Sequence, residues 1–295
     1  MKEILAKYST FGIGGPADYF IKATTTNDLI KATHKAKYEQ IPFIIIGKGS
    51  NILFDDKGFR GLIILNETSE ITLNKNNHTI KADSGVTITT LLSEIQNNNY
   101  SGLEKWTGLP GTVGGAVFGN AGCNGLETAD ILIEAEVYDP DEDTIKNLQT
   151  QDLNFSYRHS NLKNTENIIL SATFQLQNHP IDPDKLKQIK KDLATWRAKT
   201  QPFGASSGSF FANPNPENPA GKLIDEAGLK GKTIGSAQIS EKHGNFLLNK
   251  GKATFADMIK LAKLAQKTVK DKFKIDLEEE VQIITETGKT KLKSL

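Results

Sequence analysis

The order of hydrophobic and polar positions predicts a chain in which strands and helices are interspersed. Ile41–Ile46 is short, rich in β-branched residues and ended by Gly47, a pattern typical of a buried strand. Similar short apolar runs recur along the first two thirds of the chain. Further strands are predicted at Gly61–Leu65, Ile71–Leu73, Thr79–Ala82, Ile131–Tyr138 and Ile168–Leu176.

Helical spacing of apolar residues appears in four other segments. One starts with Thr26-Asn27-Asp28 as cap and first turn, and another with Thr254 and Asp257 at the spacing of a capping box. Pro183 suits the first position of a third helix. The predicted helices begin near Thr26, cover Ile88–Gln96, run from Asp182 to about Lys199, and run from Thr254 to Phe273.

Length and composition add a domain count and exclude some function classes. A chain of 295 residues predicts about two domains, and the Pro-, Gly-, Ser- and Asn-rich segment Gln201–Gly221 predicts a boundary near residue 200. With 37% hydrophobic residues the chain can bury a core. It has 36 Lys and Arg against 35 Asp and Glu, whereas nucleic-acid-binding proteins usually have a basic excess. We therefore expect no nucleic-acid partner.

The same inspection indicates a cytoplasmic protein that does not bind membranes. No apolar run approaches the roughly 20 residues that span a bilayer, and the N-terminal segment lacks the apolar core of a signal peptide. Cys123 is the single cysteine and cannot form an internal disulfide. A small packing residue is a more common role for such a cysteine than a nucleophile. The five histidines show no metal-ligand spacing, so no metal is predicted.

Glycine-rich segments are the first chemical signal. Gly47–Asn51 directly follows a predicted strand, and Gly108–Ala116 continues into a second group at Gly119–Gly122. Successive backbone N–H groups in such turns can bind an anion, although each segment alone is more often a tight turn. Neither the P-loop spacing nor the dinucleotide-binding Gly-x-Gly-x-x-Gly spacing is met. Two dense clusters favour a large phosphate-bearing cofactor.

The motifs taken together resemble the UDP-N-acetylenolpyruvoylglucosamine reductase (UDP-N-acetylmuramate dehydrogenase) family, in its shorter form. They occur in family order along nearly the whole chain, and the order is more specific than any single motif. The matching segments are Thr10–Ala17, Gly47–Asn51, Gly108–Gly115, Asn120–Gly122, Ser156–Arg158, Gln201-Pro202, Gly208–Phe211 with Asn213-Pro214, Ala220–Asp225, His243 with Asn245-Phe246 and Asn249, and Leu277 with Glu280-Val281.

The resemblance implies an α+β fold in three parts. A two-part FAD-binding fold of the vanillyl-alcohol-oxidase type would hold FAD without a covalent bond, followed by a C-terminal α+β substrate-binding domain. The expected boundaries are 1–66 for the first FAD-binding subdomain, 67–200 for the second and 201–295 for the substrate-binding domain. The implied activity is NADPH-dependent, FAD-mediated reduction of an enolpyruvyl ether of UDP-N-acetylglucosamine in peptidoglycan precursor synthesis.

Three catalytic residues follow from the resemblance. Arg158 would stabilise negative charge that spreads into the substrate carboxylate, Ser209 would donate a proton to the carbanionic carbon, and Glu280 would polarise the carboxylate. Taken alone, each has an ordinary alternative: a salt-bridging arginine, a turn serine and an exposed acidic run.

Binding residues are implied in the same way. The expected substrate-binding residues are Tyr157, Lys222, His243 and Asn245. The expected cofactor-binding residues are Gly47, Lys48, Gly49, Ser50, Asn51, Gly108, Pro110, Gly111, Thr112, Gly114, Gly115, Asn120, Ala121 and Gly122. Two positions depart from the family pattern: Ala212 stands where a lysine is usual, and Gly119 where a methionine is common.

Two alternatives remain open at this stage. One is another non-covalent FAD oxidoreductase of the same fold, which would explain the glycine clusters but not the order of Arg158, Ser209 and Glu280. The other is a non-catalytic nucleotide-sugar binding protein, for which Ala212 is the supporting feature. No obligate protein partner is predicted.

Overall fold

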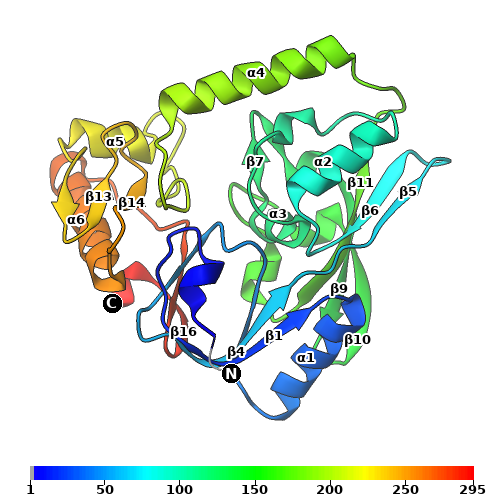
Figure 1. Cartoon of the computed structure of the whole chain (residues 1–295), viewed down its shortest axis with the longest axis horizontal. Helices are drawn as coiled ribbons and strands as arrows, with labels where there is room; N and C mark the ends of the chain where they lie inside the picture. Colours follow the sequence, from blue (N-terminus) through cyan, green and yellow to red (C-terminus); the bar gives the residue numbers. More distant parts are fainter. Residues whose placement is uncertain (1–2) are drawn as a thin grey trace. The chain divides into compact units, whose positions relative to one another are not determined.

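The computed structural model describes residues 3–295 (Figure 1), and these fall into two compact units. Unit 1 comprises Met1–Phe20, Gly49–Ile63 and Trp196–Leu295, and unit 2 comprises Ile21–Lys48 and Ile64–Thr195. Each unit is therefore built from segments that are distant in sequence. The finer division at residues 66 and 200 stays a prediction.

Unit 2 is organised around an antiparallel five-stranded sheet with the strand order β10-β9-β11-β6-β5. One face of this sheet, with Ile80 and Phe174, packs in a hydrophobic core that also contains Trp106. The rings of Trp106 and Phe174 pack edge to face, with 5.8 Å between their centroids. The apolar stripe of α2 and the buried residues of α3 belong to the same core. The strands are β5 (Ile71–Asn74), β6 (Thr79–Asp83), β9 (Leu132–Asp139), β10 (Thr144–Gln149) and β11 (Ile168–Gln175), and the helices are α2 (Ile88–Asn97) and α3 (Val113–Gly119).

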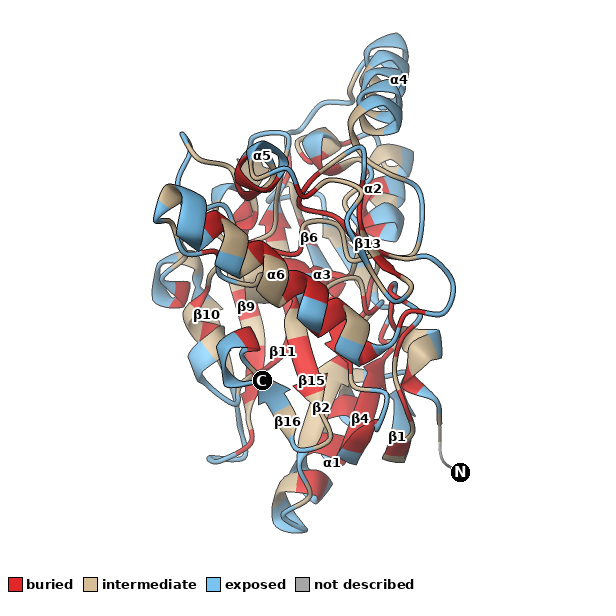
Figure 2. Cartoon of the chain, turned by 90° about the vertical axis from the view of Figure 1, so that its left-hand side faces the viewer, coloured by how far each residue is buried: buried red, intermediate tan, exposed pale blue. Residues whose placement is uncertain are grey.

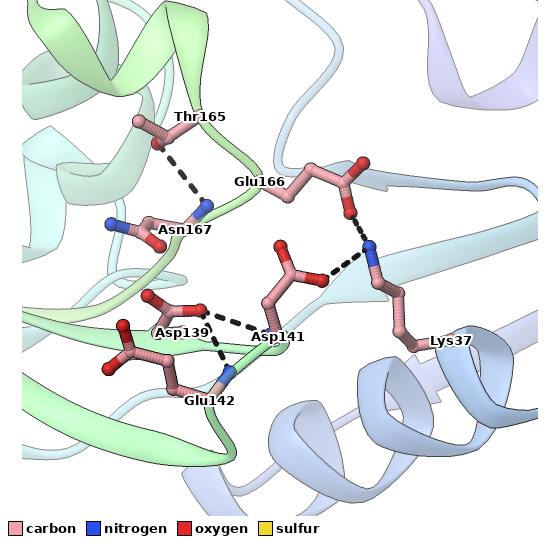
Figure 3. Close-up of polar contacts among 7 residues, drawn as sticks. All are labelled: Lys37, Asp139, Asp141, Glu142, Thr165, Glu166 and Asn167. Carbon is pink, nitrogen blue, oxygen red and sulfur yellow. Dashed lines mark hydrogen bonds and ion pairs between the residues drawn. The ribbon is translucent and has the colours of Figure 1, made fainter.

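Helix α1 (Thr26–Tyr38) also belongs to unit 2, and its cap lies one residue before the predicted one. Thr25 is the N-cap, because its side chain accepts the Asp28 N–H while the Asp28 carboxylate accepts the Thr25 N–H. Near the end of α1, Lys37 forms ion pairs with Asp141, at 2.9 Å, and with Glu166 (Figure 3). These side chains are largely solvent-exposed, so the pairs contribute little stability.

Unit 1 contains two small sheets and the long helix α6 (Phe255–Phe273). Thr254 and Asp257 form the predicted capping box, and the buried face of α6 packs in the core of this unit while its other face is exposed (Figure 2). One sheet has the order β12-β13-β14 and the other β16-β15-β3, in which β15 and β3 run parallel. The elements are β3 (Ile52–Phe54), α5 (Ala220–Glu226), β12 (Thr233–Ile234), β13 (Ala237–Ile239), β14 (Leu247–Asn249), β15 (Gln282–Thr285) and β16 (Gly288–Thr290).

The remaining strands form a three-stranded sheet, β1-β4-β2, and a short hairpin, β7-β8. Strand β2 is shorter and less buried than predicted, because it lies at the edge of its sheet and only Ile46 is fully covered. Helix α4 contains no buried residue, and none of the helices in residues 3–295 is both long and apolar enough to cross a bilayer. The bounds are β1 (Ala17–Ala23), β2 (Phe43–Ile46), β4 (Phe59–Asn66), β7 (Gly122–Cys123), β8 (Leu126–Glu127) and α4 (Pro183–Thr200).

Candidate functional site

The two glycine clusters meet within unit 2. A Cβ atom added to Gly47 would lie 2.7 Å from the Thr112 hydroxyl oxygen, so the loop after β2 touches the start of α3. Gly114 in α3 lies against Ser84, with 2.9 Å between the added Cβ and the Ser84 Cβ. A Cβ atom at either glycine would therefore be closer than van der Waals contact to its neighbour. The second cluster is not the continuous loop that its glycine content suggests, because Thr112 caps α3 and Val113–Gly119 is helical.

A pocket of about 210 Å³ lies beside these loops in unit 2. Its lining offers an ammonium group, four hydroxyl groups and the main chain of the turn between β6 and α2, a donor set that suits phosphate oxygens. Glu67, the acidic residue of the lining, has its carboxylate 3.5 Å from the Lys22 ammonium. The pocket is lined by Lys48, Glu67, Thr68, Ser69, Gly85, Val86, Thr87 and Thr90.

Sequence reasoning identified Lys48 but missed the turn between β6 and α2. Gly85 packs so closely that an added Cβ would lie 2.5 Å from the Thr68 main-chain oxygen, and its N–H donates to the Thr68 hydroxyl at 3.0 Å. The available signal was Ser84-Gly85 shortly after the predicted strand Thr79–Ala82, an arrangement similar to the one that singled out Gly47.

The other residues predicted to bind a cofactor have varied surroundings. Asn120 is 1% exposed, and its side-chain amide donates to Glu127 (2.9 Å) and to the Ser156 carbonyl (3.0 Å). Its amide oxygen accepts the Ala129 N–H at 3.0 Å, so this side chain holds loops together. Gly108 and Gly111 have positive φ, and Ala121 donates its N–H to the Ala116 carbonyl. A cofactor contact from Pro110, Gly115 or Gly122 stays a prediction.

Gly119 has open space where a side chain would stand. No atom lies within 4 Å of its added Cβ, so a Cβ atom at this position would meet no clash.

Gly49, Ser50 and Asn51, the rest of the first loop, belong to unit 1. Gly49 has φ +59° and an added Cβ would lie 1.8 Å from the Tyr8 carbonyl oxygen, so only glycine fits there. The Asn51 side chain donates to the Glu280 main-chain oxygen at 3.1 Å. The loop therefore helps to fix one of the predicted catalytic residues.

Ser209 and Glu280 are brought together in unit 1 although 71 residues separate them in sequence. The carbonyl of Phe210, next to Ser209, accepts the Glu280 N–H at 2.9 Å, and Ser209 forms a bridge with Phe246. Phe210 and Phe211 are fully buried, and they anchor this strand pair while Ser209 and Glu280 stay partly accessible. A hydroxyl and a carboxyl group are thus held at one edge of the unit 1 core.

Arg158 lies in unit 2, at a tight turn. Ser156 and His159 exchange two main-chain hydrogen bonds of 3.0 Å, and Arg158 has φ +55°. Its guanidinium carbon lies 5.2 Å from the Tyr157 ring centroid, and Nη2 donates to the Gly122 carbonyl at 3.4 Å. The Arg158 side chain thus connects two segments that match family motifs, Ser156–Arg158 and Asn120–Gly122.

The predicted substrate-binding residues differ in accessibility. Tyr157 is 48% exposed, and the Lys222 ammonium lies 4.0 Å from the Glu226 carboxylate on α5. Asn245 is 2% exposed, and its amide accepts the Phe211 N–H at 2.9 Å and donates to the Phe211 carbonyl at 2.7 Å. Asn245 therefore fixes the strand next to Ser209, and a direct substrate contact by its side chain stays a prediction.

His243 packs against the start of α5, and an added Cβ on Gly221 would lie 2.7 Å from its Cε1. Burial, followed by repulsion from Lys230, lowers the pKa of His243 below its usual value. Its Nδ1 accepts the Asn245 N–H at 3.2 Å, which places the proton of the neutral ring on Nε2. His243 therefore offers a neutral N–H donor near neutral pH.

Within residues 3–295, no group of three or more His, Cys, Asp or Glu side chains is arranged to hold a metal ion.

Comparison with known proteins identifies the chain. Residues 17–147 match the family model of an FAD binding domain, and residues 200–284 match that of the UDP-N-acetylenolpyruvoylglucosamine reductase C-terminal domain. The UDP-N-acetylenolpyruvoylglucosamine reductase of Protochlamydia amoebophila is 41% identical over 95% of this chain and 92% of its own. The same coverage applies to the Chlamydia abortus reductase, at 44% identity. The crystal structure of the Thermus caldophilus reductase matches with a TM-score of 0.80 and 32% identity, covering 96% of this chain and 98% of that one.

The chain is therefore an FAD-dependent oxidoreductase with an α+β fold and a distinct C-terminal domain. It belongs to the UDP-N-acetylenolpyruvoylglucosamine reductase family. The residues of unit 2 suit the phosphates of this cofactor, because the pocket beside the glycine clusters is lined by an ammonium group and four hydroxyl groups. Lys48, Thr87 and the main chain at Gly85 would hold its phosphates.

Proposed function

We propose that this protein reduces the enolpyruvyl ether of UDP-N-acetylglucosamine to UDP-N-acetylmuramate, with NADPH as the hydride source. The observation that supports this most strongly is its similarity, over 95% of its length, to proteins named as this reductase. The reaction adds a hydride and a proton across one carbon–carbon double bond. FAD, when bound, supplies the hydride that originates from NADPH.

Arg158 holds the substrate carboxylate in this proposal. When hydride adds to the terminal vinyl carbon, negative charge develops on the carbon that carries the carboxylate and spreads into it. A planar guanidinium can donate two parallel hydrogen bonds to a carboxylate, which stabilises that charge. Tyr157, largely exposed beside Arg158, lies where it can contact the same ligand.

Ser209 donates the proton that completes the reduction. Its hydroxyl is a weak acid, but a carbanion is a strong base, so fixed geometry makes the transfer feasible. The neighbouring Phe210 is fully buried, and its main chain is bonded to Asn245 and Glu280. Ser209 therefore lies beside a buried, hydrogen-bonded main chain, which suits proton transfer at a defined carbon.

Glu280 polarises the substrate carboxylate as a protonated acid. Its main chain is held from two sides, by the Phe210 carbonyl at 2.9 Å and by the Asn51 side chain at 3.1 Å. We further propose that Lys222 and His243 contact the nucleotide part of the substrate, His243 through its Nε2–H. The product enters peptidoglycan synthesis in the cytoplasm, which links the protein to cell-wall growth, cell shape and cell division.

Separate measurement of the two half-reactions tests this function. Purified protein with FAD should show a flavin spectrum that bleaches with NADPH under anaerobic conditions and recovers when the enolpyruvyl substrate is added. In the Ser209→Ala variant, bleaching should keep its rate while recovery slows by about 10²-fold or more. Ser207→Ala is a matched control in the same loop, with no expected effect on either step.

Two results would contradict the proposal. A protein that stays colourless with FAD would not be a flavoenzyme. Another oxidoreductase of this fold would be indicated if NADPH reduces the flavin and simple carbonyl compounds derived from alcohols reoxidise it, but the enolpyruvyl nucleotide sugar does not. Unchanged recovery in Ser209→Ala would remove Ser209 from its assigned role.

A further inference from the structure

Arg158 has a backbone conformation that residues with a side chain rarely adopt. Its φ of +55° lies in the left-handed region, and the paired hydrogen bonds between Ser156 and His159 make Arg158 the second central residue of the turn. Glycine or asparagine is usual at such a position. Strain of this kind persists only where the surrounding structure fixes it, and it concentrates at functional sites.

Lys163 contacts the strained residue directly. Its Nζ donates to the Arg158 main-chain oxygen at 2.6 Å and lies 5.8 Å from the centroid of the Phe118 ring. A hydrogen bond from a charged donor is stronger than a neutral one, and the aromatic face attracts the same ammonium group. The lysine stem is half-buried, which restricts its movement.

A second set of bonds ties this lysine to the body of unit 2. Ser160 is fully buried and donates its hydroxyl to the Phe118 carbonyl at 2.8 Å, while the Lys163 N–H donates to the Ser160 carbonyl at 3.2 Å. Phe118 belongs to α3, whose start lies in the glycine-rich cluster. The turn at Arg158 is thus connected to α3 through Lys163 and Ser160.

We propose that Lys163 is a positioning residue, which holds the Arg158 turn in its left-handed conformation and so orients the guanidinium for the substrate carboxylate. The assignment rests on the proposed function of Arg158, but the conformational part can be tested without any reaction.

Lys163→Met tests the proposal, because methionine keeps an unbranched stem but loses the charge and the hydrogen bond. We expect flavin recovery with the enolpyruvyl substrate to slow by about tenfold, while reduction by NADPH stays within twofold of the wild-type rate. Lys163→Arg, which can donate to the same oxygen, should restore most of the rate.

Lys272 is a matched control in unit 1. Its Nζ donates to the Glu226 main-chain oxygen at 2.6 Å and lies 5.4 Å from the Phe273 ring centroid, the same pair of contacts as Lys163. Lys272→Met should leave both half-reactions unchanged. An equal slowing in Lys272→Met would mean that loss of any such contact is enough, and would overturn the assignment to Lys163.

A double-mutant comparison separates positioning from a direct catalytic role. If Lys163 acts through Arg158, then Lys163→Met should cause no further loss in an Arg158→Met background. A further tenfold loss in that background would show independent action and would overturn the proposal.

The crystal structure of Lys163→Met gives an outcome that does not depend on the reaction. We expect Arg158 to leave the left-handed region or its guanidinium to lose a single defined position. An unchanged turn with an ordered guanidinium would overturn the positioning role. Wild-type flavin that never recovers with the enolpyruvyl substrate would instead overturn the proposed function, so the two failures are distinguishable.

Discussion

The backbone strain at Arg158 predicts which of two variants at this position, Arg158→Gly or Arg158→Ala, is the more stable. Arg158→Gly and Arg158→Ala both remove the guanidinium and its contacts with Tyr157 and Gly122. They differ in that alanine must still adopt φ +55°. The left-handed conformation costs a residue with a Cβ atom about 1–2 kcal/mol, and glycine avoids this cost.

Glycine also makes the unfolded chain more flexible, which lowers folding stability by roughly 0.4–1 kcal/mol. The midpoints of these two ranges leave Arg158→Gly more stable than Arg158→Ala by about 0.8 kcal/mol. At Lys260, an exposed position in α6, the order should reverse, because glycine in a helix is about 1 kcal/mol less stable than alanine. Lys260→Gly and Lys260→Ala therefore serve as the control pair.

Urea unfolding followed by circular dichroism measures both pairs, with FAD at the same saturating concentration. Both Arg158 variants should also lose rapid flavin recovery with the enolpyruvyl substrate while keeping reduction by NADPH. If the glycine variant at position 158 is no more stable than the alanine variant, the strain argument is wrong. Equal stability in the Lys260 pair would show that the assay cannot resolve the difference.

Three further predictions concern unit 1. Asn245→Ala leaves the buried main-chain N–H and carbonyl of Phe211 without their partner, so stability should fall by about 2–4 kcal/mol in urea unfolding, and a loss below 1 kcal/mol would contradict the assignment. Burial lowers the pKa of His243, so the unfolded chain binds its proton more readily than the folded one. The melting temperature of the wild type should therefore fall as the pH drops below about 6.5, and His243→Gln should flatten this dependence. The same pH dependence of melting temperature in both proteins would refute the prediction. Thr254→Ala removes the N-cap of α6 and should cost about 1 kcal/mol, whereas Thr254→Ser should cost little if the hydroxyl bond to the Asp257 N–H is what matters.

Elements with strong periodicity were predictable from the sequence. Ile88–Gln96 corresponds to α2 and the segment from Thr254 to Phe273 to α6, because each has a continuous apolar stripe and a start signal. The strands of the five-stranded sheet were also found, except β10. That strand lies at a sheet edge with no fully buried residue, so its sequence lacks an apolar alternation.

Short or glycine-rich elements could not be predicted in this way. Strands β12 and β13 have two and three residues, too few to show a period, and they exist because neighbouring strands and α6 complete them. Helix α3 contains Gly114, Gly115 and Gly119, which disfavour a helix, yet it forms with Thr112 as its cap and apolar Val113 and Val117 in the core. Tertiary packing therefore overrides local propensity at this helix.

The residues of the candidate site were proposed from family motifs, and their geometry could not be predicted from the sequence. The family motifs indicated Arg158, Ser209 and Glu280. No local pattern predicts the hydrogen bond from the Glu280 N–H to the Phe210 carbonyl, which brings Glu280 close to Ser209 in the fold. The left-handed turn at Arg158 was equally hidden, since arginine is not typical of that position. Lys163 gave no signal, because a lysine in a polar segment is ordinary until its hydrogen bond is seen.

The parallel pairing of β3 with β15 determines when the protein can finish folding during synthesis. Ile52–Phe54 is translated 230 residues before its partner Gln282–Ile284. All of unit 2 has been made by Thr195, so it can fold before β15 of unit 1 has been translated. Until Gln282–Ile284 has been translated, the N-terminal segments of unit 1 expose strand edges and apolar side chains, and a nascent chain truncated shortly before residue 282 would be a substrate for chaperones and proteases.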